Sequence, residues 1–88
     1  MLPKKHIPED IEEGEYLPVV QIFHSPWEFY FDFGYVTVRA DPSEQEFKVK
    51  RRIKMSPSQA KAFLNALKEN IERYETAYGT IKLPGEAP

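Results

Sequence analysis

The clearest pattern along the chain is the alternation of aromatic and other residues in WEFYFDFGY, residues 27–35. On a strand, every second side chain points to the same face of a sheet. The aromatic residues of this stripe are Trp27, Phe29, Phe31, Phe33 and Tyr35. The period predicts a strand from Trp27 to about Val38, in which Gly34 marks a bulge or a bend.

Two further strands are predicted on either side of this one. Leu17 to His24 is rich in Val, Ile and Phe, which favour strands, and apolar residues on both of its faces leave open which face is buried. EFKVKRRIK, from Glu46 to Lys54, alternates basic with mostly apolar residues. The segment Asp41 to Glu44, with the sequence DPSE, is predicted to form the turn that closes the second hairpin.

SPWE at 25–28 and SPSQ at 56–59 both have the residues of a helix start, with Ser as N-cap, Pro next and Glu or Gln at the third position. The residues after the first segment repeat with period two, so it is predicted to be a tight turn. After the second, apolar residues recur at spacings of three and four. They predict an amphipathic helix from about Pro57 to Ala77 that ends at Gly79.

The order of these elements predicts an α+β fold, an antiparallel three-stranded β-meander followed by one long amphipathic C-terminal helix. The folded domain is expected to extend over residues 16–81. Residues 1–15 are rich in acidic residues and proline and are expected to be an N-terminal tail, and residues 82–88 a C-terminal tail. The core is expected to lie under the helix, where it would contain Trp27, Phe29, Phe31 and Phe33.

The apolar stripe of the predicted helix also repeats as a heptad. It consists of Ala60, Leu64, Leu67, Ile71, Tyr74 and Tyr78, and Phe63 widens it. A chain of 88 residues without cysteine builds only a small core of its own. We therefore expect a homodimer, with an interface at Leu67, Ile71, Tyr74 and Tyr78. The alternative is a monomer in which Ile81 and Leu83 fold back over the end of the helix.

Composition and charge exclude several classes of function. Twelve basic and fourteen acidic residues leave a net charge of −2, which argues against bulk attraction to nucleic acid or to membranes. The chain has no run of about 20 apolar residues and no apolar signal region at its start, so no membrane association and a cytoplasmic location are expected.

Residues that could catalyse a reaction do not converge in this sequence. His24 is adjacent to Ser25, but neighbouring side chains on a strand point apart. The two histidines, without any cysteine, lack the spacing of a metal site, and no glycine-rich nucleotide-binding motif occurs. Glu28 and Asp32 share a strand face at a separation of about 13 Å, too far for a glycosidase pair. We expect no enzyme, no cofactor and no metal.

The remaining candidate is the basic row, defined as Lys48, Lys50, Arg52 and Lys54. Alternate strand residues lie about 6.6–7 Å apart, which is close to the phosphate spacing of an extended single strand. Tyr30, on the neighbouring strand, is a residue on which a base could stack. The basic row and Tyr30 are therefore a candidate surface for single-stranded nucleic acid.

Two other interpretations of the basic row stay open. It could be a solvated sheet face, in which Glu28 and Asp32 pair with some of the cations across the strands. The chain could also be a structural or adaptor module without a nucleic-acid role, which docks another protein through a sheet edge or a helix end.

SPWEFYFDFG (25–34) and RRIKMSPSQAKAFLNALKENIERYETAYG (51–79) resemble the motifs SPxEFxLDFG and RIxMSPxxAKxLLxxLxxNIxxYExxFG of the domain-of-unknown-function family 3467, found in bacteria and archaea. The resemblance covers about residues 18–80. The chain departs from it at Tyr30 and Phe31, where the family prefers an aliphatic residue before Asp32, and at Tyr78, where phenylalanine is usual. The family has no settled activity, so the resemblance implies a fold and no mechanism.

The order of strands before a helix is also similar, in topology alone, to the dimeric single-stranded-DNA-binding folds of the transcriptional coactivator PC-four and of Pur-alpha. Fold does not imply function, so this second resemblance supports the nucleic-acid interpretation only as an analogy.

Overall fold

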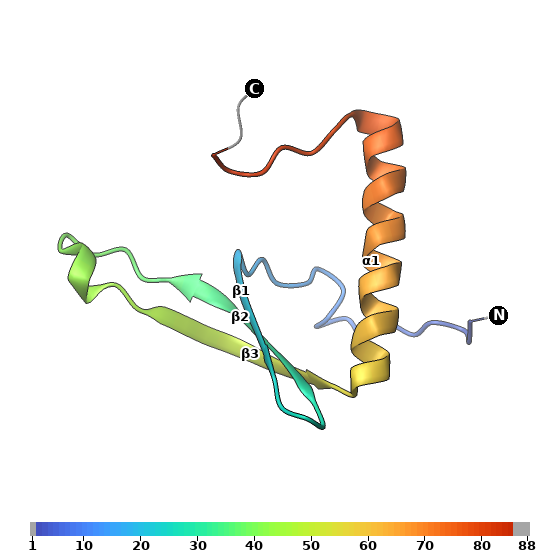
Figure 1. Ribbon diagram of the computed structural model, residues 1–88, viewed down its shortest axis with the longest axis horizontal. Helices are drawn as coiled ribbons and strands as arrows, with labels where there is room; N and C mark the ends of the chain where they lie inside the picture. Colours follow the sequence, from blue (N-terminus) through green and yellow to red (C-terminus); the bar gives the residue numbers. More distant parts are fainter. Residues whose placement is uncertain (1, 86–88) are drawn as a thin grey trace. The chain divides into compact units, whose positions relative to one another are not determined.

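The computed structural model describes residues 2–85 of the chain. The strands β1 (Val19–His24), β2 (Phe29–Val36) and β3 (Phe47–Met55) precede the helix α1 (Pro57–Tyr78), as Figure 1 shows. The strands form one sheet in the order β1-β2-β3. The predicted α+β fold, an antiparallel meander followed by a C-terminal helix, is confirmed. Met1 and residues 86–88, which belong to the predicted tails, lie outside the described residues.

The described chain divides into two compact units. One consists of residues 2–21 and Phe31–Arg52 and contains most of the hairpin of β2 and β3. The other consists of Ile22–Tyr30 and residues 53–85 and contains the turn between β1 and β2 and the whole of α1. Each of the three strands is therefore shared between the units.

The turn between β1 and β2 is organised by Ser25. The backbone N–H of Ser25 donates to the carbonyl oxygen of Glu28 at 2.9 Å. Its side-chain Oγ accepts from the backbone N–H groups of Trp27 and Glu28, each at 3.2 Å. These bonds confirm the predicted tight turn, and they keep Trp27 in the turn. Trp27 is 77% exposed, so the prediction that it belongs to the core was wrong.

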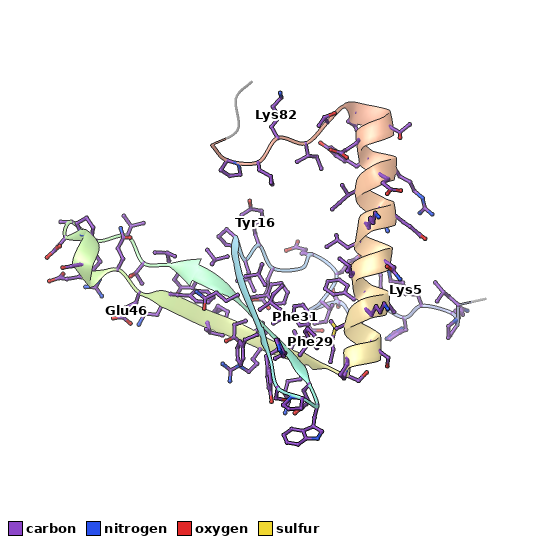
Figure 2. All side chains as sticks on the ribbon, viewed as in Figure 1. Lys5, Tyr16, Phe29, Phe31, Glu46 and Lys82 are labelled. Carbon is purple, nitrogen blue, oxygen red and sulfur yellow. The ribbon has the colours of Figure 1, made fainter. Side chains whose placement is uncertain are left out.

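The core of the described chain is small. Phe31, which is 5% exposed, is the buried hydrophobic residue among residues 2–85, as predicted. Phe29 and Phe33, two residues away on either side along β2, are half-buried. Figure 2 shows Phe29 and Phe31 on this strand. Of the four aromatic residues expected in the core, one is buried and two are partly covered.

Gly34 is buried within β2 at a point where β3 comes very close. A Cβ atom at Gly34 would lie 1.9 Å from the backbone oxygen of Lys48 and 2.9 Å from the Phe47 ring. Any larger residue would overlap the neighbouring backbone. The sequence marked Gly34 as special, and the close approach of β3 is the physical reason.

The loop from β2 to β3 is closed by hydrogen bonds between Thr37 and Glu46. The N–H of Thr37 donates to the carbonyl oxygen of Glu46 at 2.9 Å, and the N–H of Glu46 donates to Thr37 Oγ1 at 3.0 Å. The predicted turn contains the short 3₁₀ helix Pro42–Glu44, shown in Figure 1 at the end of this hairpin. The backbone N–H of Ser43 donates to Asp41 and, with the Ser43 hydroxyl, lowers the pKa of Asp41.

Helix α1 starts and ends close to the positions that the sequence predicts. Ser56 Oγ accepts from the N–H of Gln59 at 3.2 Å, with Pro57 as the first helical residue. At the other end, Gly79 has a φ of +101°, and its N–H donates to the carbonyl oxygen of Glu75. None of the helix residues is buried; Ala60 is half-buried, and the other members of the apolar stripe are exposed.

Candidate functional site

All four residues of the basic row lie on β3, at alternate positions and with exposed side chains. The sequence anticipated this alternation. The structure adds three carboxylates, which pair with three of the four cations. The pairs are Glu46 with Lys48 at 3.2 Å, Asp32 with Arg52 at 2.7 Å and Glu28 with Lys54 at 3.9 Å.

The pair of Asp32 and Arg52 has the strongest geometry of the three. Arg52 donates from Nε and from an NH2 group to the two Asp32 oxygens, at 2.7 and 2.8 Å. Asp32 is only 5% exposed. The hydrogen bond from Arg52 lowers the pKa of Asp32, and the Arg52 charge adds to this, while burial opposes it. The Asp32 carboxylate therefore stays ionised at neutral pH, and the expectation that it pairs with a cation of β3 is confirmed.

Lys50 is the residue of the basic row whose side chain has no carboxylate partner within residues 2–85. The neighbouring Arg51 points to the other strand face and pairs with Glu15 of the N-terminal segment at 2.6 Å. Lys48 pairs with Glu46, two residues before it on the chain, and both side chains are about half exposed. Among the residues of the basic row in this unit, which are Lys48, Lys50 and Arg52, Lys50 is therefore the cation most accessible to an anion.

In the other unit, Tyr30 is held by two neighbours. Its hydroxyl donates to Glu28 Oε1 at 3.3 Å, and Glu28 also pairs with Lys54. The ring stacks on Phe23, with centroids 4.8 Å apart and planes 10° apart. One face of the Tyr30 ring is therefore already covered by protein, which reduces its value as a platform for a base.

Sequence reasoning missed the role of Phe23. The predicted tight turn could have indicated this contact. A chain reversal at residues 25–28 places Phe23 opposite Tyr30 and His24 opposite Phe29. His24 does stack on Phe29, at 5.3 Å between ring centroids. Odd residues of β1 therefore share a sheet face with Tyr30, and even residues share a face with Phe29. The sequence left open which face of this strand is buried; in the structure Val19 is half-buried and Val20–His24 are exposed.

The described residues contain no group of three or more His, Asp or Glu side chains that could hold a metal ion. None of the helices in residues 2–85 is long and apolar enough to cross a membrane.

The predicted oligomer interface lies on one element, α1. Leu67, Ile71, Tyr74 and Tyr78 are 47, 39, 50 and 78% exposed. The rings of Tyr74 and Tyr78, one helical turn apart, lie 5.0 Å from each other. A groove of about 380 Å³ runs along this side of the helix. Its lining residues are Leu64, Leu67, Lys68, Ile71, Glu72 and Glu75. The structure thus brings the predicted interface residues together and leaves them accessible.

These features define the class of protein as a small α+β domain with an ion-paired strand face and an amphipathic helix that has no buried residue. Residues 2–83 match the family model described as protein of unknown function (DUF3467), and the chain belongs to this family. This match confirms the resemblance seen in the two motifs. No curated protein and no solved structure matches the chain.

Proposed function

We propose that the protein is a non-enzymatic binding protein that works as a homo-oligomer, in which α1 joins the copies. The observation that carries this proposal is the exposure of α1. The helix has 22 residues and an apolar stripe along its length, and none of its residues is buried.

The physical argument rests on what an amphipathic helix needs. Most of the stability of a protein helix comes from packing of its apolar face and little from intrinsic propensity. Large contiguous apolar patches are rare on monomeric proteins and mark interaction sites. On α1, Leu64 is 61% exposed and Leu67 is 47% exposed, on the same side of the helix. A second copy that covers this stripe would remove the apolar surface from water.

Light scattering during gel filtration tests the proposal. We expect a mass of about twice 10.3 kDa for the native chain. Leu67→Glu places a charge in the stripe and should convert the dimer to a monomer. Asn65→Glu, which adds the same charge on another side of α1, is the matched control and should leave the dimer intact. A native protein that stays monomeric at high micromolar concentration would refute the proposal.

Single-stranded nucleic acid is a second candidate ligand, favoured by the accessibility of Lys50 and its neighbours. Lys48 and Lys54 are held by exposed ion pairs, which are worth little and can exchange for phosphate contacts. Arg52 differs, because a phosphate would have to displace a bidentate bond and leave the buried Asp32 charge unpaired. This candidate therefore counts three phosphate contacts, from Lys48, Lys50 and Lys54, and leaves out Arg52.

This second candidate predicts a specific salt dependence. With three phosphates neutralised on a single strand, log K should fall with log salt at a slope of about −2. Fluorescence anisotropy of a labelled oligonucleotide measures it. Lys50→Glu should abolish binding. Arg73→Glu, which makes the same change of charge on α1 outside both the basic row and the apolar stripe, is the control and should leave binding intact. A folded protein that binds no oligonucleotide at tens of micromolar would exclude this candidate.

An adaptor role, in which the oligomer docks a different protein, makes a different prediction. Variants of the basic row such as Lys48→Glu and Lys50→Glu should then leave the capture of that protein unchanged. Loss of capture in these variants would argue against a helix end or sheet edge as the docking surface.

A further inference from the structure

The apolar stripe of α1 is uneven in size, and this unevenness carries information about how two copies would pair. The stripe begins with the small residue Ala60 and ends with the large residues Tyr74 and Tyr78, with Leu64, Leu67 and Ile71 between them. Layers of a well-packed helix pair match a large residue with a small one. The small end of one stripe is therefore complementary in size to the large end of another, whereas two small ends or two large ends are not complementary.

We propose that α1 pairs with α1 of a second copy in antiparallel orientation, around a two-fold axis that passes between Leu67 and Ile71. This inference rests on the proposed function, since it specifies the interface of that homo-oligomer. The stripe residues occupy the a and d positions of a heptad. In an antiparallel pair, each a position of one helix faces a d position of the other. The layers are Ala60 with Tyr78, Leu64 with Tyr74, and Leu67 with Ile71, each formed twice.

This register uses every member of the stripe. A shift by one heptad in either direction would leave two of the six stripe residues on each helix without a partner layer. The two-fold symmetry also makes the interface self-complementary, as a closed dimer requires.

Charges beside the stripe agree with the same register. Lys61 on one helix lies opposite Glu75 on the other, which gives two attractive pairs by symmetry. The Glu75 carboxylate is held in place by the N–H of Ile81, which donates to Oε2 at 2.8 Å, and its other oxygen remains to meet a lysine. Lys68 lies near the two-fold axis, opposite Lys68 of the second copy. This is one repulsive contact, between two exposed side chains, against two attractive pairs. The balance of charge contacts favours this pairing.

A parallel pair fits the same sequence poorly. Each stripe residue would then face its own copy, so Ala60 would leave a gap at one end and Tyr78 would crowd its partner at the other. The flanking positions would bring Asn70 beside Glu75 and no lysine beside a carboxylate. Neither size nor charge is complementary in that arrangement.

Single-cysteine variants test the orientation, because the native chain has no cysteine. Ala60→Cys and Tyr78→Cys are prepared separately, and each is oxidised alone and as a one-to-one mixture. In the antiparallel pair, the two copies of residue 60 lie about 27 Å apart along the axis, as do the two copies of residue 78. A disulfide requires Cβ atoms within about 4.5 Å, so neither variant should cross-link to itself.

The mixture should form a disulfide between one chain of each variant, at least about tenfold faster than either variant alone. Light scattering on the same reduced samples separates this inference from the proposed function. A dimer in which each variant cross-links to itself would overturn the antiparallel orientation while the oligomer stands. A dimer without cross-links in any sample would exclude α1 as its interface. A monomer would refute both the inference and the proposed function.

Discussion

Gly34 is the residue of β2 that has no room for a side chain. A Cβ atom there would lie 1.9 Å from the Lys48 carbonyl oxygen, and a backbone atom cannot rotate away as a side chain can. We predict that Gly34→Ala lowers the free energy of unfolding by about 1–3 kcal/mol, the usual cost of overpacking. Urea denaturation measures the change. Val38→Ala, at a position that is 95% exposed, should be nearly neutral, and equal stability of the two variants would contradict the close approach.

Asp32 should make the stability of the protein depend on pH. Arg52 holds the pKa of Asp32 below its ordinary value of about 3.9, so the folded state binds the proton less readily than the unfolded state does. The stabilisation is therefore complete above about pH 4 and is lost as the pH falls through the lowered pKa of the folded state. We predict that the native protein loses more thermal stability between pH 6 and pH 3 than Asp32→Asn does.

Thermal denaturation followed by circular dichroism at several pH values checks this. Asp41 contributes in the same direction, because the Ser43 N–H lowers its pKa as well, and Asp41→Asn is the comparison variant. Asp32→Asn should also be less stable at neutral pH, since an amide cannot accept two bonds from Arg52 as a carboxylate does. Identical pH profiles for the native protein and Asp32→Asn would show that the ion pair has no role in stability.

Individual residues were predictable where a local rule applied. The alternation of β3 placed its four cations on one face, and the shared face of Glu28 and Asp32 indicated that both carboxylates pair with cations of that row. Trp27 was misplaced because the aromatic period extends one position into the turn, where Ser25 binds its backbone. The burial of Asp32 could not be read from the sequence, since it depends on how neighbouring strands cover that position.

At the scale of elements, the helix was the best-predicted part of the chain. Its N-terminus is fixed by the side chain of Ser56 and its C-terminus by Gly79, and both are local signals. β1 and β2 are shorter than the apolar pattern suggested, whereas β3 keeps the predicted length of nine residues and is shifted by one position. β1 starts after Pro18, which has no N–H to donate, and β2 ends at the Thr37 side-chain bond to Glu46.

The end of α1 gives a prediction at this scale. Gly79 has a φ of +101° and a ψ of 166°, a conformation that is nearly confined to glycine, although a Cβ atom there would touch nothing within 4 Å. Gly79→Ala should therefore destabilise the protein through backbone strain alone, by about 1–3 kcal/mol. Circular dichroism should show fraying of the last turn. Thr80→Ala, the next residue, is the control, and a Gly79→Ala variant as stable as the control would contradict the strain.

At the scale of the whole molecule, stability should be linked to association. If a second copy covers the stripe of α1, the folded dimer is favoured by mass action and its melting temperature rises with protein concentration. Calorimetry over a hundredfold range of concentration should show this for the native chain and not for Leu67→Glu. A melting temperature that is independent of concentration in both would indicate that the chain folds without a partner.

The size of the core was the feature that sequence reasoning judged least well. The apolar stripes of α1 and of β2 match in length, so a core under the helix was the natural expectation. Yet periodicity shows only which residues share a face, and it does not show which second face covers them. Phe31 is the buried hydrophobic residue in the described chain, and no residue of α1 is buried there.

Trp27 has a consequence for spectroscopy. It is the single tryptophan of the chain, and its indole is 77% exposed in the turn between β1 and β2. Because water surrounds this ring in the native state as it does in the denatured chain, its emission should change little on unfolding and an added quencher should reach it throughout. The same property makes it a sensitive optical probe for any molecule that docks against that turn, without a label.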